Sequence, residues 1–164
     1  ESTMTEKEMY LQSWEREFQT TLKVLKAYPA DKLDFKPHER SRSARDLAWT
    51  FVAEEAIVDM VVKGQIDFKE GPKAPATMKE ILAALESTHK EMVPKVKALT
   101  EADYNSTIKF PIGPKQMGDF RKADVLWMMM MDAIHHRGQF SVYLRMAGGK
   151  VPSIYGPSAD EPWM

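Results

Sequence analysis

Residues 123–146 read ADVLWMMMMDAIHHRGQFSVYLRM and form the longest apolar helical segment of the chain. Gly148 and Gly149 follow as a stop signal. The longest unbroken apolar run, Val125 to Met131, has seven residues, far short of the roughly 18 that a membrane-spanning helix needs. The stretch therefore predicts a long helix in the core of a soluble protein.

Three further helices precede this segment. Apolar residues recur at helical spacing over residues 4–26, over 43–64 and over 77–99. Pro94 lies inside the third of these helices and is expected to kink or break it. Two pairs resemble capping boxes that start the second and third helices, Ser43 with Asp46 and Thr77 with Glu80.

Four helices joined by loops of medium and greater length predict an all-α four-helix bundle rather than an alternating strand and helix fold. The 164 residues are close to the size of one ordinary domain, so we expect a single domain over residues 4–164. Residues 1–3 are expected to be a remnant of cloning, with Met4 the original start. The connection 106–120 is expected to be a short irregular ribbon, and the proline-containing tail 151–164 to be extended.

Charge and composition exclude several classes of function. Lys and Arg total 23 against 24 Asp and Glu, which gives no electrostatic reason to expect nucleic acid or an anionic membrane as a partner. The chain has no cysteine, so disulfides, thiolate metal sites and a cysteine nucleophile are excluded. No Gly-rich phosphate loop, G-x-S-x-G elbow or H-E-x-x-H motif occurs. The start of the chain does not resemble a signal peptide, and a cytoplasmic location is expected.

The strongest candidate site lies on the last predicted helix. Asp132 and His136 are four positions apart, so their side chains rise from one face and can converge on a single ion. His135 is offset by roughly 100° around the axis and is expected to point elsewhere. Gln139 is a candidate to orient His136, and Arg137 is expected to be solvated or to form an interhelical salt bridge. The alternative for His136 is a core histidine hydrogen-bonded to a carboxylate.

The second predicted helix carries two polar side chains on its inward face, Thr50 and Glu54. An ionised Glu54 in an apolar core needs a cation, so it would complete a ligand set with Asp132 and His136. Alternatively, it pairs with Lys or Arg at the rim of the bundle. Glu55 is expected at the surface.

His89 lies on the apolar stripe of the third helix, either as a pocket-lining fourth ligand or as a satisfied core histidine. A further arrangement pairs a carboxylate and a histidine three positions apart on two helices, as Glu86 with His89 and Asp132 with His135. Di-iron carboxylate bundles use such pairs together with single glutamates from the other two helices. The candidates for those single glutamates are Glu15, Glu17, Glu54 and Glu55.

Several motifs resemble the DinB superfamily of bacterial four-helix bundles. They are FKPH at 35–38, SRSARDLAW at 41–49, IHHRGQFSVYLR at 134–145 and VPSIYG at 151–156, in the expected order. The resemblance implies an up-up-down-down bundle, frequent homodimers and a divalent metal near one end, held by a His of helix two and an H-x-x-x-H pair of the last helix. Characterised relatives include metal-dependent transferases and isomerases that use low-molecular-weight thiols such as bacillithiol or mycothiol.

Carried onto this sequence, the histidine pair falls on Asp132 and His136, and the helix-two histidine falls on Thr50. Glu54, one turn along from Thr50, can substitute for it and complete an Asp, Glu and His ligand set. The expected cofactor is a divalent metal, one of Zn, Ni, Mn and Fe. Alternatively the site is vacant, and Thr50, Asp132 and His136 are the hydrogen-bonded lining of a pocket. The residues expected to line the pocket beside the ligands are Thr50, His89 and Gln139.

We therefore expect a metal-dependent transferase that activates a small thiol cosubstrate for transfer to an electrophile. Its partners would be a small-molecule substrate and a second copy of the chain, with no nucleic acid and no membrane. The rival is a non-enzymatic bundle whose metal site has been lost and which serves as a ligand-binding or dimeric interaction module.

Overall fold

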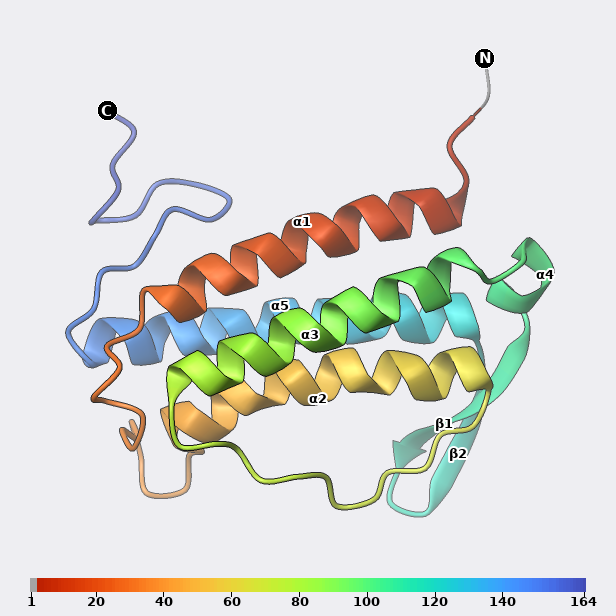
Figure 1. Ribbon diagram of the computed structural model, residues 1–164, viewed down its shortest axis with the longest axis horizontal. Coiled ribbons are helices and arrows are strands. Elements are labelled where there is room, and N and C mark those ends of the chain that lie inside the picture. The colour runs from red at the N-terminus through yellow and green to blue at the C-terminus, as the bar shows by residue number, and fades with distance from the viewer. Residues whose placement is uncertain (1–2) are drawn as a thin grey trace.

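The computed structural model of the protein describes residues 3–164 and contains four long helices that lie side by side (Figure 1). All four were predicted from the sequence pattern. Residues 1 and 2, part of the expected cloning remnant, lie outside the described residues. The elements are α1 Glu6–Lys26, α2 Ala44–Lys63, α3 Met78–Lys97, α4 Glu101–Tyr104, β1 Thr107–Gly113, β2 Gln116–Arg121 and α5 Lys122–Met146.

Side-chain caps explain where α2 and α3 begin. Thr77 and Glu80 form the predicted capping box, each side chain accepting from the backbone N–H of the other residue. The Ser43 hydroxyl accepts from the N–H of Asp46 as a simple N-cap. The break expected at Pro94 does not occur, and α3 continues beyond this residue. The proline lacks the N–H that would bond to the carbonyl oxygen of Lys90, yet the helix runs on to Lys97.

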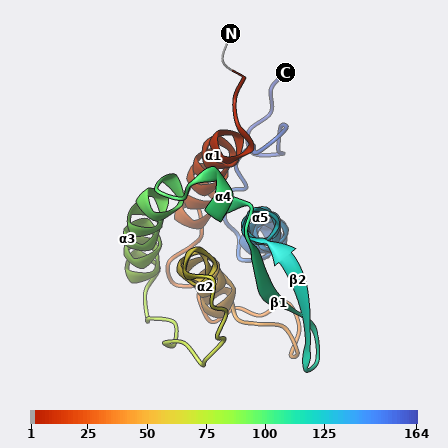
Figure 2. The ribbon, with the colours of Figure 1, turned by 90° about the vertical axis from the view of Figure 1, so that its right-hand side faces the viewer.

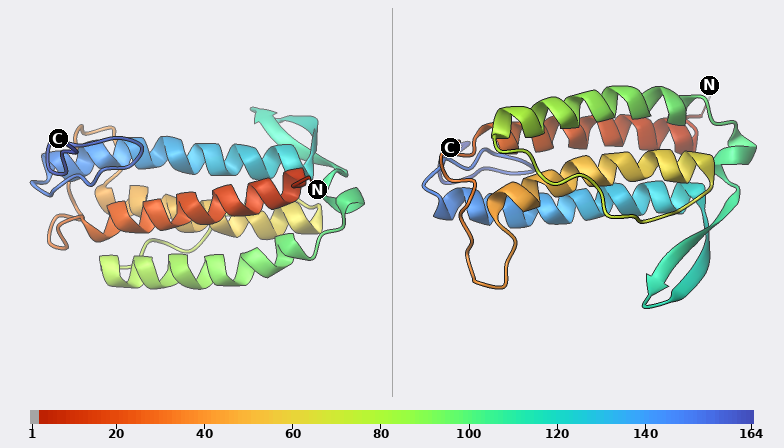
Figure 3. Two further views of the ribbon diagram at one scale, coloured as in Figure 1. Left: turned by 90° about the horizontal axis from the view of Figure 1, so that it is seen from above. Right: turned by 60° about the horizontal axis from the view of Figure 1, so that its bottom comes forward.

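Each long helix packs against two neighbours, so α1 and α2 lie on one diagonal of the bundle and α3 and α5 on the other (Figure 2). Helices α1 and α5 run in one direction, and α2 and α3 in the other (Figures 1 and 3). The order along the chain is up-down-down-up, which corrects the up-up-down-down order that the resemblance implied. The reason is the connection 64–77, which runs back along the bundle from the end of α2 to the start of α3.

Strands β1 and β2 form an antiparallel hairpin in place of the irregular ribbon expected there (Figure 2). Ile108 and Phe110 are buried while Thr107 and Lys109 are exposed, the period of two that a strand with one covered face shows. The protein is therefore mostly helical with a small two-stranded sheet, rather than all-α. Within residues 3–164, none of the helices combines the length and apolar character that crossing a lipid bilayer requires.

The buried apolar side chains form two clusters along the length of the bundle. Phe51 of α2 and Phe140 of α5 belong to one, and Val58 of α2 and Met130 of α5 belong to the other. The segment of α2 around Glu54 and the facing segment 132–136 of α5 lie between these positions. The predicted site residues therefore lie midway along the bundle, rather than near one end as the resemblance implied.

Candidate metal centre

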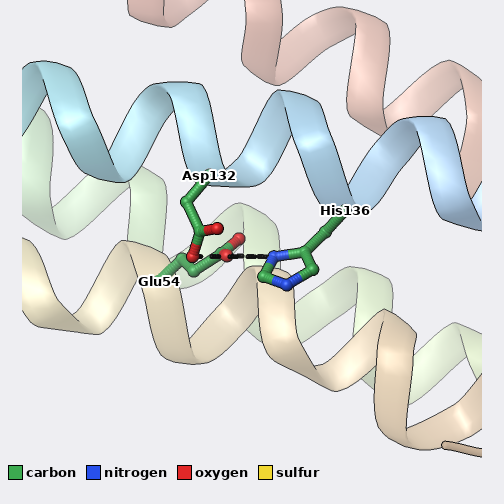
Figure 4. Close-up of side chains that lie close together, drawn as sticks. All are labelled: Glu54, Asp132 and His136. Atoms are coloured by element: carbon green, nitrogen blue, oxygen red, sulfur yellow. Dashed lines mark hydrogen bonds and ion pairs between the residues drawn. The ribbon is translucent and has the colours of Figure 1, made fainter. Parts of the chain in front are cut away.

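Three potential metal ligands from two neighbouring helices converge in the middle of the bundle (Figure 4). Glu54 comes from α2, and Asp132 and His136 come from α5. One ligand atom of each side chain lies within 4.8 Å of those of the other two. Within residues 3–164, no other group of three or more His, Asp and Glu side chains meets this criterion. The structure thus brings together the three residues that the sequence singled out as ligands.

The two helices explain this convergence. Asp132 and His136 are separated by about one turn of α5, so they share a face. Helix α2 packs beside α5 in the opposite direction, and its residue Glu54 reaches the same face. Glu54 is only 6% exposed, whereas the side chain of Asp132 is 45% exposed. The cluster therefore has a buried floor at Glu54 and opens to solvent beside Asp132.

The donor atoms form a set that fits a cation. Nδ1 of His136 lies 2.5 Å from Oε1 of Glu54 and 3.8 Å from Oδ2 of Asp132. The second oxygen of Glu54, Oε2, is buried and has no hydrogen-bond partner among the described residues. An unpartnered buried carboxyl oxygen is unfavourable unless something satisfies it. Because two carboxylates and an imidazole suit divalent transition metals, these residues fit a metal ion that would also satisfy Oε2.

Electrostatics set the protonation of the cluster. Burial, assisted by a hydrogen bond and the negative charge of Asp132, raises the pKa of Glu54 to about 9. Burial also lowers the pKa of His136; Arg42 and His135 act in the same direction and the charge of Asp132 opposes them. At neutral pH without a metal, Glu54 is therefore protonated and the imidazole of His136 is neutral.

Thr50 does not join this group of ligands. Its hydroxyl donates to the carbonyl oxygen of Asp46 at 3.0 Å and accepts from the guanidinium of Arg42 at 2.7 Å. The hydroxyl is thus engaged both as a donor and as an acceptor. The contribution of α2 to the cluster comes from Glu54, one turn further along.

His89 is a buried histidine whose ring nitrogens both face carboxylates. Nδ1 lies 3.1 Å from Oε2 of Glu55, and Nε2 lies 2.8 Å from Oε2 of Glu15. Glu55 also accepts a hydrogen bond from Nε1 of Trp14 at 2.8 Å, so its expected place at the surface is wrong. His89 is not part of the lining of the pocket beside His136. It is the satisfied core histidine, not a fourth ligand.

Two neighbours of His136 on α5 also find other partners. Gln139 does not orient His136 but contacts His135, with 3.0 Å between their Nε2 atoms, because these two residues have the i, i+4 spacing. His135 is exposed and does not join the ligand group, in agreement with the expectation that it points elsewhere. Arg137 is buried and donates to Oε2 of Glu17 at 2.7 Å. It forms an interhelical salt bridge, one of the two predicted roles.

The di-iron arrangement is not assembled. Glu86 is exposed and pairs with Lys26 at 3.6 Å, and His135 points to solvent. Glu17 is bound by Arg137. One member of each carboxylate and histidine pair therefore faces away from any common centre.

An open pocket of about 530 Å³ adjoins the candidate metal centre at His136, a volume suited to a small molecule. The segment before α2 forms one wall and the second half of α5 forms the other. The sequence reasoning missed Arg40 and Arg42 in the first wall; their signal is the basic character of the residues just before the predicted cap Ser43. The lining residues are Arg40, Ser41, Arg42, Leu47, His136, Gln139, Val142 and Tyr143.

Comparisons with known proteins agree with this fold. The uncharacterised protein YrdA of Bacillus subtilis (strain 168) is 29% identical over 160 residues, which cover 93% of this chain and 89% of that protein. The crystal structure of a DinB-like protein from Bacillus cereus ATCC 10987 superposes with a TM-score of 0.76 at 22% identity, covering 89% of this chain and 95% of that one. The DinB-like protein YjoA from Bacillus subtilis gives 0.70 at 18% identity, with 90% and 97% covered. The model of the DinB family matches residues 3–163, and the chain therefore belongs to the DinB family.

Proposed function

We propose that this DinB-family protein binds one divalent metal ion through Glu54, Asp132 and His136 and uses it to transfer a small thiol to an electrophile. The observation that carries the metal site is the buried, unpartnered Oε2 of Glu54 beside an imidazole and a second carboxylate. The thiol is supported by the resemblance to DinB relatives that use low-molecular-weight thiols.

The donor set favours Zn, Ni, Mn or Fe(II), because two carboxylate oxygens and one imidazole nitrogen are borderline to hard ligands. A bound ion of this kind would lower the pKa of a thiol and so raise the concentration of the thiolate nucleophile. Three protein ligands leave coordination positions open, the pattern typical of catalytic rather than structural metal sites.

The chain's own residues would fix the geometry of the site. Glu54 is held by burial, and His136 is held by its contact with Glu54. Asp132 stands on the solvent side of the cluster. The adjoining pocket reaches His136 and is open to solvent, so a small molecule can enter next to the ligands.

The proposed reaction is a substitution at carbon. A bond forms between the thiol sulfur and the electrophilic carbon, the bond from that carbon to its leaving group breaks, and the thiol proton passes to solvent. The sequence of this chain contains no cysteine, so the sulfur must come from a cosubstrate.

The metal claim is tested by equilibrium dialysis of metal-stripped protein against Zn, Ni, Mn or Fe(II), followed by elemental analysis. We expect one ion per chain, lost in His136→Gln and retained in the matched control His135→Gln, which changes the exposed neighbour. The transfer claim is tested by mixing loaded protein with bacillithiol or cysteine and an activated aryl chloride, and measuring the thioether. Absence of metal binding at neutral pH contradicts the whole proposal, whereas metal binding without thioether contradicts only the transfer.

The non-enzymatic bundle is favoured by one observation, the contact of Arg42 with Thr50 at the position of the helix-two histidine. The guanidinium of Arg42 places a positive charge at this position of α2, so an anionic ligand could bind there without a metal ion. A thermal-shift screen separates the two proposals, since a bound metal raises the Tm with its concentration. A Tm that responds to organic ligands but to none of the four metals would favour the binding module.

A further inference from the structure

The arginines of this chain divide into two groups. Within residues 3–164, five of the seven form ion pairs with carboxylates, and the remaining two, Arg40 and Arg42, form none. Both of these line the pocket that adjoins His136. The five arginines with ion pairs are Arg16, Arg45, Arg121, Arg137 and Arg145.

Arg42 is fixed in place at both ends. Its carbonyl oxygen accepts a hydrogen bond from the Tyr143 hydroxyl at 3.0 Å, which ties the segment before α2 to α5. Its guanidinium donates to Oγ1 of Thr50 at 2.7 Å. A guanidinium has five N–H donors, so most remain free for a ligand. Because the hydrogen bond to Thr50 restricts this exposed side chain, less conformational entropy is lost when an anion binds.

The charge balance at the pocket favours an anion whether or not a metal is present. The pocket lining contains Arg40 and Arg42 and no carboxylate. Of the three candidate ligands, only His136 belongs to this lining. When a divalent ion is bound, its two charges balance the two carboxylates and the arginine charges remain. A cleft with a net positive charge concentrates anionic ligands.

We propose that this pocket binds the carboxylate or phosphate group of the protein's small-molecule ligand, with Arg42 as its main anchor and the exposed Arg40 as a second contact. The planar guanidinium fork matches both of these oxyanions. This inference rests on the proposed function for the identity of the site, since the anion would be held beside the metal ligands. It narrows the substrate class to small anionic molecules.

Calorimetric titration tests the proposal with three probes: succinate, methyl phosphate and the neutral succinamide. Each is added to metal-free protein and to protein loaded with Zn. We expect succinate or methyl phosphate to bind saturably, and succinamide to leave their binding unchanged. The anion that binds more tightly identifies whether the pocket prefers a carboxylate or a phosphate. We expect tighter anion binding by the loaded protein.

Variants assign the binding to the arginines. Arg42→Gln removes a charge-assisted contact and is expected to weaken anion binding by about tenfold or more. Thr50→Val keeps Arg42 but removes the hydroxyl that accepts its hydrogen bond. We expect a smaller loss of anion affinity than in Arg42→Gln, and no loss of fold. Arg16→Gln removes the same charge on α1, outside the pocket lining, and should leave the affinity unchanged.

The outcomes distinguish this inference from the metal proposal. Arg42-dependent anion binding to a protein that takes up no metal would support the pocket and contradict the proposed function. Three results would contradict anion binding in the pocket and leave the metal site unaffected. They are metal uptake without anion binding, equal affinity for the anions and for succinamide, and equal anion affinity of the Arg42→Gln and Arg16→Gln variants.

Discussion

The Nδ1 atom of His136 on α5 lies 2.5 Å from Oε1 of Glu54 on α2, although the two residues are 82 positions apart in the sequence. This contact joins two antiparallel helices at the middle of the bundle. Without a metal it is a contact between a protonated carboxyl group and a neutral imidazole. The proton on Glu54 must leave before its carboxylate can bind a metal ion.

Metal binding should therefore release a proton. The pKa of Glu54 is about 9, and a carboxylate must be deprotonated to bind a metal. His136 is already neutral at pH 7, because its pKa is lowered. We expect about one proton released per ion and an affinity that rises about tenfold per pH unit between pH 7 and 9. Calorimetry in buffers of different ionisation enthalpy measures this number, and zero released protons would contradict the assigned protonation of Glu54.

Glu54→Gln should have opposite effects on metal binding and on stability. Because the pKa of Glu54 is higher in the folded chain than in the unfolded one, the folded state loses stability as pH rises from the unfolded value toward 9. Glutamine does not titrate, so the metal-free variant should be more stable than the parent at pH 8, by roughly 1–3 kcal/mol. Urea unfolding measures the difference. A variant that is less stable and still binds metal would be incompatible with a buried, protonated ligand.

Asp132→Asn should weaken metal binding by about 10- to 100-fold, because the amide keeps the shape of the side chain but removes the charge of a ligand. The stability of the metal-free protein should change by only about 0.5 kcal/mol, since the side chain is half-exposed. The exposed residue Asp119 of the hairpin offers a matched control as Asp119→Asn. Equal metal affinity in the two variants would remove Asp132 from the ligand set.

His89 should make stability depend on pH. Burial disfavours its charge, but hydrogen bonds and negative charge from Glu55 and Glu15 outweigh burial and raise its pKa above the usual 6.5. This contribution is fully present below the unfolded pKa and is lost as pH rises through the folded pKa. The stability difference between the parent and His89→Gln should therefore be largest near pH 6 and shrink toward pH 9. A difference that grows with pH would show that His89 is neutral in the fold.

Arg137 should be the most important arginine for stability. It is 2% exposed and donates to the carboxylate and carbonyl oxygens of Glu17 and to the hydroxyl of Tyr155. Arg137→Gln leaves a buried carboxylate without its cation, at a cost of about 3–5 kcal/mol. The salt bridge between the exposed Arg145 and the partly buried Asp160 gives the control, and Arg145→Gln should cost about 1 kcal/mol or less. Chemical unfolding compares the two, and similar losses would contradict the role assigned to Arg137.

The convergence of Glu54, Asp132 and His136 could be predicted largely because the strongest signal was local. Asp132 and His136 share one helix, where spacing alone fixes the face. Glu54 followed from its place on the inward face of α2. Glu55 was misplaced because α2 packs against both α3 and α5, so two successive positions are both buried although they differ by about 100° around the axis.

The partners of polar side chains and the direction of helices could not be predicted in the same way. The carboxylates that bind His89 come from α1 and α2, and no local pattern links them to α3. The up-down-down-up order depends on the path of the connection 64–77, which has no periodic pattern. Arg42 lies outside the helices, and its contact with Thr50 depends on how the segment before α2 folds back.

The location of the metal ion tests the central claim most directly. Anomalous diffraction at the absorption edge of Zn or Mn, from crystals of the loaded protein, shows where the ion binds. We predict one strong peak among the carboxylate oxygens of Glu54 and Asp132 and the imidazole of His136, absent in Glu54→Gln. A peak elsewhere, or none at saturating metal concentration, would contradict the assignment.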